Sequence, residues 1–183
     1  MVEEGSNVLR DLVRHVGRYP DDAFLFVREG LAKTAEHTHG TETDAHRRLY
    51  RYLAAHHLDW SDLVARYQAG ELPRAVVKDI EAAGGCGKLN RHLTGRELCC
   101  GLRDYAIARW GMMARVVLAA WNIRETADFG RIVFGFIEFN IMQKQPEDSP
   151  DDFNNVFDFG EAFDKAFDLA SDSGKDAKHT SEG

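Results

Sequence analysis

The sequence predicts an all-α protein, a single-domain helical bundle around one long central helix at about residues 94–122. Thr94 and Glu97 have the spacing of a capping box, in which each side chain bonds the backbone amide of the other residue. Beyond this cap, apolar residues recur at steps of three or four and form one stripe on a helix. The stripe consists of Cys99, Leu102, Ala106, Trp110, Met113, Val117 and Trp121. We therefore expect Trp110 and Trp121 to be largely buried. No alternating pattern longer than four or five residues predicts a competing β-strand.

Two helices are predicted before residue 40. Ser6 or Asn7 is the candidate cap of the first helix, which runs to about Tyr19 with its apolar residues on one face. Pro20 occupies a first-turn position of the second helix, and the two aspartates that follow it suit the positive end of a helix dipole. This second helix is expected to end near residue 36, before a polar loop.

Residues 41–90 have a weaker pattern and are interpreted as a helical insertion into the domain. Thr43 and Ser61 are candidate caps of helices that end near residues 58 and 68. Pro73 is expected to start a third helix, which runs to about residue 83. The glycine-rich joint over residues 84–87 ends it.

The last predicted helix covers about residues 129–142, with Thr126 or Asp128 as its cap. Its apolar residues wrap around more than one face, which is typical of an interior helix. Residues 145–183 then contain 11 Asp and Glu against 3 Lys and Arg. The apolar residues of this acidic segment extend the helical domain over residues 1–167. The polar composition of residues 168–183 predicts a disordered tail.

The composition is that of an ordinary globular protein, with 44% hydrophobic and 29% charged residues in a chain of 183. No run approaches the roughly 18 consecutive apolar residues of a membrane-spanning helix. The acidic N-terminus lacks the apolar stretch of a secretory signal. Three cysteines, two of them adjacent, do not form a disulfide framework. We therefore expect a cytoplasmic protein without a membrane segment.

Several segments, in this order, also indicate a family. They are residues 19–31, 92–98, 101–106, 117–118, 121–123, 128–130 and 148–163. With them the chain resembles the conserved hypothetical protein family shared by planctomycetes and verrucomicrobia. The resemblance covers a little over half of the chain, and the connection over residues 41–90 is longer than is usual in that family. It implies a bacterial, cytosolic protein without an assigned reaction, cofactor or catalytic residue, so no role is transferred to any position.

The histidines near residue 40 are candidate metal ligands. His37 and His39 can offer two imidazoles to one ion, and His46 and Asp44 are the nearest further ligands. The spacing matches no established ligand motif, and the run is hydrophilic. The favoured interpretation is a set of structural or solvated histidines, so no metal or cofactor is assigned.

Cys99 and Cys100 are candidate catalytic thiols. They lie in the second turn of the predicted central helix, with two arginines nearby in the sequence, and a lowered thiol pKa there is one alternative. Cys86 and His92 extend the pair to a possible second metal site, but the spacing matches no zinc module. Because Cys99 also belongs to the apolar stripe, packing is the favoured role.

Residues 46–52 mix basic and aromatic side chains, which is one property of nucleic-acid-binding surfaces. Acidic residues flank this run, and residues 1–144 together carry a net charge of only +1. Binding to nucleic acid requires several phosphate contacts at once. The composition therefore favours a solvated helix face over a nucleic-acid interface.

The acidic segment near the C-terminus is rich in phenylalanine. Phe159, Phe163 and Phe167 have the i, i+4, i+8 spacing of one helical face. One interpretation is a clasp that folds back over the helical body. The other is a docking segment that presents these three side chains to the groove of a partner protein. The two roles are compatible.

The sequence favours a non-enzymatic protein-binding adaptor or regulator with an unidentified protein partner, because it presents a well-specified core and no convergent catalytic set. Phe159, Phe163 and Phe167 are the candidate partner-binding residues. The alternatives are a metal- or thiol-dependent enzyme that uses the His37/His39 or Cys99/Cys100 region, and a nucleic-acid-binding protein. The oligomeric state is not predicted.

Overall fold

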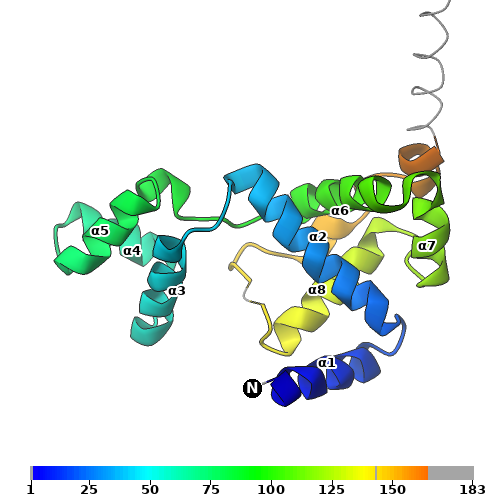
Figure 1. The fold of residues 1–183 in the computed structure, drawn as a ribbon, viewed down its shortest axis with the longest axis horizontal. Coiled ribbons are helices and arrows are strands. Elements are labelled where there is room, and N and C mark those ends of the chain that lie inside the picture. Colours follow the sequence, from blue (N-terminus) through cyan, green and yellow to red (C-terminus); the bar gives the residue numbers. More distant parts are fainter. Residues whose placement is uncertain (1, 143, 165–183) are drawn as a thin grey trace, which may run out of the picture. The chain divides into compact units, whose positions relative to one another are not determined.

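The computed structural model of the chain describes residues 2–142 and 144–164, with side chains from Val8 onward. Within these ranges every regular element is a helix and no strand is present, which confirms the all-α fold class (Figure 1). The α-helices are α1 (Val2–Val16), α2 (Asp21–His39), α3 (Asp44–His56), α4 (Trp60–Gln68), α5 (Arg74–Ala82), α6 (Gly95–Trp110), α7 (Ala114–Ala120) and α8 (Thr126–Glu138). Short 3-10 helices are η1 (Cys86–Lys88), η2 (Gly111–Met113) and η3 (Pro150–Phe153). The predicted tail, residues 168–183, lies outside the described residues.

The chain folds into two compact units. Unit 1 contains the chain up to Thr34 and from Leu93 onward, and unit 2 is Ala35–His92. The boundary after Thr34 falls within α2. The predicted insertion, residues 41–90, lies entirely within unit 2. Among the helices that the structure describes, none has both the length and the apolar character needed to span a membrane.

Helix α8 is the interior helix of unit 1, and α1, α6 and η3 pack on it. Its rings Phe129 and Phe136 are fully buried. Glycines allow the neighbours to approach: a Cβ at Gly130 would lie 2.8 Å from the Phe153 side chain of η3. The helix runs from Thr126 to Glu138, earlier at both ends than the predicted 129–142, and its N-cap is Glu125 rather than Thr126 or Asp128.

Helices α2 and α6 also meet closely in unit 1. A Cβ at Gly101 of α6 would lie 2.0 Å from the Oγ1 atom of Thr34 in α2. Thr34 is buried, and its hydroxyl donates a hydrogen bond of 2.7 Å to the carbonyl oxygen of Gly30 one turn earlier. Such contacts leave no room for a side chain at Gly101, so the crossing depends on that glycine.

The predicted continuous helix over residues 94–122 is wrong. Its capping box is present, with the Thr94 amide donating to Glu97 at 2.9 Å and the Glu97 amide donating to Thr94 at 3.2 Å. The helix ends at Trp110, however, because Gly111 adopts φ +54° and ψ −130°, outside the helical region. The η2 turn follows, and Figure 1 shows α7 leaving the direction of α6.

This break changes which side of the chain faces the core. The stripe predicted Met113 and Val117 as interior residues, but Ala114 and Leu118 are buried instead, and Met113 is 55% exposed. A 3-10 turn has three residues per turn rather than 3.6, so the apolar register of α6 is not continued into α7. Trp110 and Trp121 keep only a minor part of their surface exposed and pack against the core of unit 1, as the sequence predicted.

Unit 2 has a separate apolar core. Helices α3 and α5 pack together. The interior is filled by buried residues from α3, α4 and α5 and from the residues that follow α5 and η1. The core residues are Ala45, Leu49, Leu53, Leu63, Val76, Ile80, Ala83 and Leu89. Thr43 caps α3 as predicted, with His46 as the reciprocal residue of its capping box. Asp59 rather than Ser61 caps α4.

Candidate functional site

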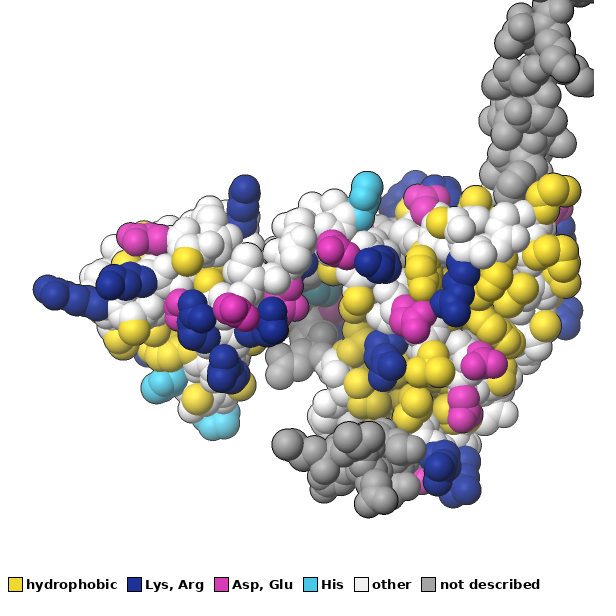
Figure 2. Space-filling view, viewed as in Figure 1, with side chains coloured by type: hydrophobic (Ala, Val, Ile, Leu, Met, Phe, Trp, Pro, Cys, Tyr) yellow, Lys and Arg dark blue, Asp and Glu magenta, His cyan; other side chains and the backbone are white. Residues whose placement is uncertain are grey.

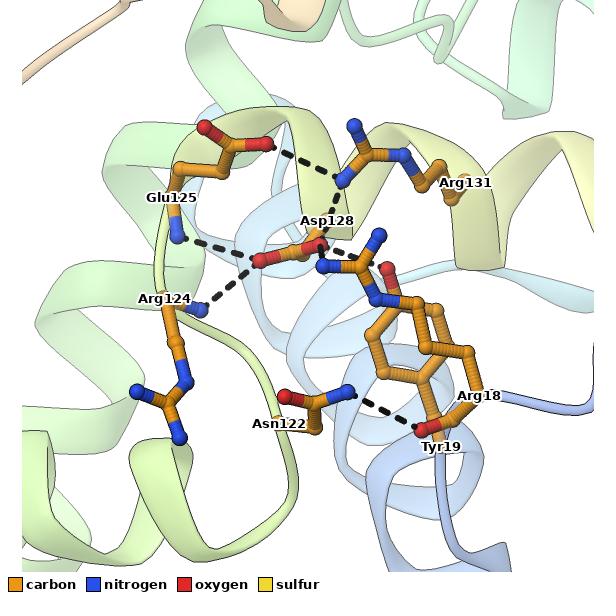
Figure 3. Close-up of polar contacts among 7 residues, drawn as sticks. All are labelled: Arg18, Tyr19, Asn122, Arg124, Glu125, Asp128 and Arg131. Atoms are coloured by element: carbon orange, nitrogen blue, oxygen red, sulfur yellow. Dashed lines mark hydrogen bonds and ion pairs between the residues drawn. The ribbon is translucent and has the colours of Figure 1, made fainter.

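The described residues include one fully buried carboxylate, that of Asp128 near the start of α8 (Figure 3). One oxygen, Oδ2, accepts hydrogen bonds from the backbone amides of Arg124 at 2.8 Å and Glu125 at 3.1 Å. The other, Oδ1, accepts from the Tyr19 hydroxyl at 2.6 Å and from Arg131 Nη1 at 2.5 Å. Asp128 thus joins the turn between α1 and α2 to the first turn of α8.

The electrostatics of this cluster stabilise the ionised carboxylate. Burial alone raises the pKa of Asp128, but the amides of Arg124 and Glu125, the Tyr19 hydroxyl and the Arg131 guanidinium outweigh it and hold the pKa below its ordinary value. Burial and the hydrogen bond to the carboxylate raise the pKa of Tyr19 to about 12. A carboxylate with a lowered pKa is a poor general base, so the cluster is suited to structure rather than proton transfer.

The contacts around Asp128 are also complete. Arg18 Nη2 lies 3.7 Å from Oδ1, and Arg131 also bonds Glu125 at 3.1 Å. Asn122 donates to the carbonyl oxygen of Arg18 at 3.4 Å. In the described part of the chain, no buried side-chain nitrogen or oxygen lacks a partner. We therefore interpret this cluster as the polar anchor of unit 1.

A groove of about 470 Å³ lies in unit 1 between α1, α8 and η3. Its volume is in the range of small-molecule sites. Its polar lining is already paired, however: His15 and Glu138 lie 3.4 Å apart, and Asn154 donates to Asp151 at 2.9 Å. The fifth polar residue, Arg131, is bound to Asp128. The groove thus offers an apolar floor without polar groups converging on a ligand.

The most exposed large apolar side chains gather where α6 ends. Met112 is 75% exposed, Met113 55% and Val116 56%, and we call these three residues the methionine surface. Three other large apolar residues in the described ranges are exposed, at 39–40%, and they are distant from these in the sequence. Figure 2 shows apolar side chains collected on the face that includes α2 and α7. A group of exposed apolar residues is typical of an interaction site.

Trp110, two residues before Met112 in the sequence, lines a pocket of about 260 Å³. Trp110 and Trp121 meet edge to face, with ring centroids 5.3 Å apart, and Trp110 also lies 5.1 Å from the ring of Phe26. Half-buried tryptophans combine a large apolar area with few rotatable bonds. They are therefore frequent anchors of protein interfaces.

Charged residues border this pocket. The Arg109 guanidinium lies 5.3 Å from the Trp110 ring and donates to Glu29 at 2.8 Å. Tyr105 donates to the same carboxylate at 2.9 Å. These hydrogen bonds from Tyr105 and Arg109 lower the pKa of Glu29. Together they fix an apolar wall with a charged rim, the arrangement of many protein interfaces.

The structure does not bring the candidate histidine ligands together into one site. His37 and His39 lie in the last turn of α2, and His39 Nε2 is 3.0 Å from the carbonyl oxygen of His92. His46 is buried, with Nδ1 2.8 Å from the Thr43 hydroxyl and Nε2 3.4 Å from the Lys88 carbonyl oxygen. No group of three ligating side chains suited to a metal ion occurs among residues 2–142 and 144–164.

The cysteines have different environments. Cys99 is fully buried in the core of unit 1, which confirms the packing interpretation. Burial, and secondarily the neighbouring Cys100, raise the pKa of the Cys99 thiol to about 12. A thiol that stays protonated is a poor nucleophile. Cys100 and Cys86 are half-buried.

The basic run of α3 is occupied by ion pairs. Arg48 donates to Asp79 of α5 at 2.6 and 2.9 Å, and Arg47 lies 3.3 Å from Asp44. The carboxylates that flank the run therefore neutralise part of its charge. Nothing in these contacts favours a nucleic-acid interface over the solvated face expected from the sequence.

The phenylalanine segment packs on unit 1. Phe153, Phe159 and Phe163 are buried in its core, and Phe159 lies 5.8 Å from Phe129 of α8 between ring centroids. This confirms the clasp interpretation for these residues. Docking of Phe159 and Phe163 to a partner stays a prediction, and Phe167 lies outside the described residues.

No protein-family model matches the chain, no curated protein matches it, and neither does any solved structure. The resemblance to the planctomycete and verrucomicrobial family therefore stays a prediction.

Sequence reasoning missed the methionine surface. The apolar residues between positions 99 and 121 keep a helical spacing across Gly111, so the spacing predicts that Met113 is an interior residue. Gly111 was the available signal, because glycine in a helix interior is unfavourable by about 1 kcal/mol relative to alanine. The sequence did point to Asp128, but only as a local cap, since its partner Tyr19 is 109 residues away.

Proposed function

We propose that the protein is a non-enzymatic protein-binding module, an adaptor or regulator, and that the methionine surface is its binding site. The observation that carries this proposal is the exposure of Met112, Met113 and Val116, which follow the pocket residue Trp110 closely in the sequence. Solvent-exposed methionines on a packed scaffold are suited to contacts with apolar side chains, because the thioether chain adapts to different shapes.

The pocket supports the same role. A partner's apolar side chain would enter the pocket that Trp110 and Trp121 line together, and the methionine surface would contact the partner's neighbouring residues. Buried aromatic anchors contribute a large share of the affinity of protein interfaces. The three cysteines are free thiols, which fits the cytoplasmic location that we propose for this function.

The test uses two matched variants with three serine substitutions each. One variant carries Met112→Ser, Met113→Ser and Val116→Ser. The control removes the other exposed apolar side chains: Val8→Ser, Tyr50→Ser and Ile141→Ser. Both variants should remain folded, as checked by circular dichroism, because every substituted side chain is exposed.

Each protein is used to capture partners from the cells that produce it, with a photo-crosslinking residue placed at position 115 to mark neighbours of the methionine surface. We expect the wild type and the control to cross-link the same protein at that position, and the Met112/Met113/Val116 variant to lose it. Equal capture by all three proteins would refute the proposed site. Capture by the wild type that is lost only in the control would place the binding site elsewhere.

A further inference from the structure

The pocket of about 260 Å³ in unit 1 combines aromatic rings with carboxylates. Helix α2 lines it with Asp22, Phe26 and Glu29, whose spacing of i, i+4 and i+7 places them on one face of the helix. The lining also includes Arg109, Trp110 and Trp121. Two carboxylates against one guanidinium give this lining a net negative charge.

Glu29 and Trp110 already hold a guanidinium of the same chain. The Arg109 guanidinium lies 5.3 Å from the centre of the Trp110 ring, and it donates to Glu29 at 2.8 Å. A guanidinium is planar and weakly hydrated, so it can lie on an aromatic face while its N–H groups reach a carboxylate. A tryptophan and a carboxylate of this pocket are therefore suited to that group.

Trp121 and Asp22 are a second pair of the same residue types. Trp121 lies towards the start of α2, because the neighbouring Asn122 donates to the carbonyl oxygen of Arg18 at 3.4 Å. Asp22 is exposed in the first turn of α2. Among the described residues, its carboxylate has no hydrogen-bond or ion-pair partner. This pair thus differs from Glu29 and Trp110 in having no guanidinium of its own.

We propose that the pocket binds an arginine side chain of the partner protein, with the guanidinium against Trp121 and its N–H groups on Asp22. The inference rests on the proposed function, and it names the residue that the partner contributes. The apolar part that enters the pocket is the carbon stem of arginine, since such stems pack on apolar surfaces while the charged end stays at the rim. Both oxygens of Asp22 are open to the two-point contact that arginine makes and lysine does not.

The probe is N-acetyl-arginine amide, which carries this side chain without further groups, titrated into the full chain. N-acetyl-citrulline amide is the matched control, because citrulline replaces the guanidinium by a neutral urea group of similar shape. Sodium chloride added to the citrulline titration equalises the ionic strength. N-acetyl-lysine amide tests the choice of cation. Heteronuclear NMR follows the indole N–H signals of Trp110 and Trp121, with Trp60 of unit 2 as the internal reference.

Two single variants test the position of the contact. Asp22→Asn removes a carboxylate that lines the pocket, whereas Asp21→Asn removes its neighbour, which does not line it. Both aspartates are exposed in the first turn of α2. The two variants therefore change the net charge and the interaction with the helix dipole alike, and both should remain folded.

We expect the arginine compound to shift the Trp110 and Trp121 signals saturably without moving the Trp60 signal. It should bind at least about threefold more tightly than the citrulline compound, because only the guanidinium makes a cation–π contact and an ion pair. Asp22→Asn should weaken this binding by about two- to fivefold, and Asp21→Asn should leave it unchanged.

Three results would overturn the inference: equal binding of the arginine and citrulline compounds, equal effects of the two variants, or no shift up to about 50 mM. Binding of the lysine compound at least as tight as that of the arginine compound would overturn the assignment to arginine.

The two proposals fail in different ways. If the arginine compound does not bind but serine substitution of the methionine surface abolishes partner capture, the surface binds a partner that places no arginine in the pocket. If the compound binds but capture is unaffected by those substitutions, the pocket is a cation site and the proposed function is wrong. If both hold, Asp22→Asn should reduce partner capture and Asp21→Asn should not.

Discussion

Replacement of the buried carboxylate by Asp128→Asn tests whether its four hydrogen bonds anchor unit 1. In one orientation the NH2 group of the new asparagine faces the backbone N–H groups of Arg124 and Glu125, and in the other it faces the Arg131 guanidinium. In both orientations the NH2 group, a donor, faces another donor. A hydrogen bond to a charged group contributes about 1.5–3 kcal/mol, and a buried donor left unsatisfied costs about 1–3 kcal/mol. We expect a loss of about 2–4 kcal/mol, a large part of the roughly 5–15 kcal/mol of a typical domain.

Urea unfolding at pH 7 measures this loss, with circular dichroism for the whole chain. Tryptophan fluorescence in a Trp60→Phe background follows unit 1, because only Trp110 and Trp121 then remain. Asp79→Asn is the matched control, because Asp79 also accepts hydrogen bonds from an arginine but is partly exposed and its partner Arg48 is half exposed. Surface ion pairs contribute about 1 kcal/mol or less. A loss for Asp128→Asn below about 1 kcal/mol, or equal to that of Asp79→Asn, would refute the anchor role.

The pH dependence supplies an independent check. The pKa of Asp128 in the folded protein lies below its ordinary value of 3.8. The stabilisation by the ionised Asp128 is therefore fully present at pH values above 3.8, and it is lost as the pH falls through the lower pKa of the folded protein. We expect the difference between the wild type and Asp128→Asn to narrow below about pH 4. A difference that stays constant down to pH 2 would contradict an ionised carboxylate in the folded state.

Two further predictions concern packing and alkaline pH. Gly101→Ala would bring a methyl group to 2.0 Å from Thr34, so we expect urea unfolding to show a loss of about 1–3 kcal/mol or more in the free energy of unfolding. Gly87→Ala is the control and should be neutral, because a methyl group there meets open space. Similar values for both variants would contradict the close crossing of α2 and α6. The pKa values of Cys99 and Tyr19 are both raised to about 12, above their ordinary values of 9.0 and 10.0. The stabilisation by these neutral groups should therefore be fully present below pH 9 and decrease from pH 9 to pH 12. Thermal unfolding between pH 8 and 11 follows this decrease, which Cys99→Ala should delay. A stability that is constant to pH 11 would contradict the raised pKa values.

Local chemistry explains which parts of the fold were predictable. The caps at Thr43 and Thr94 depend on residues three positions apart, and both are present. The buried role of Cys99 follows from a short apolar period within α6. In each case the determining contacts lie within one or two turns of the residue, so the sequence pattern carries them.

Contacts between distant segments explain the rest. The chain leaves the helical conformation at Gly111, where φ is +54°, and the helical spacing of apolar residues in the sequence does not show this change. Asp128 reads as a cap in isolation, whereas its burial and its bond to Tyr19 require α1, α2 and α8 to be in place. The methionine surface was missed for the same reason, because the exposure of its residues depends on how the chain turns between α6 and α7.

Because of the turn at Gly111, the residues that present the exposed surface differ from the residues that hold the two helices together. Met112 and Met113 face outward because of the backbone between α6 and α7, so their side chains are not needed to hold the two helices together. Their replacement by other residues should leave the free energy of unfolding nearly unchanged. The surface is therefore able to change its choice of partner during evolution while the scaffold that presents it stays the same.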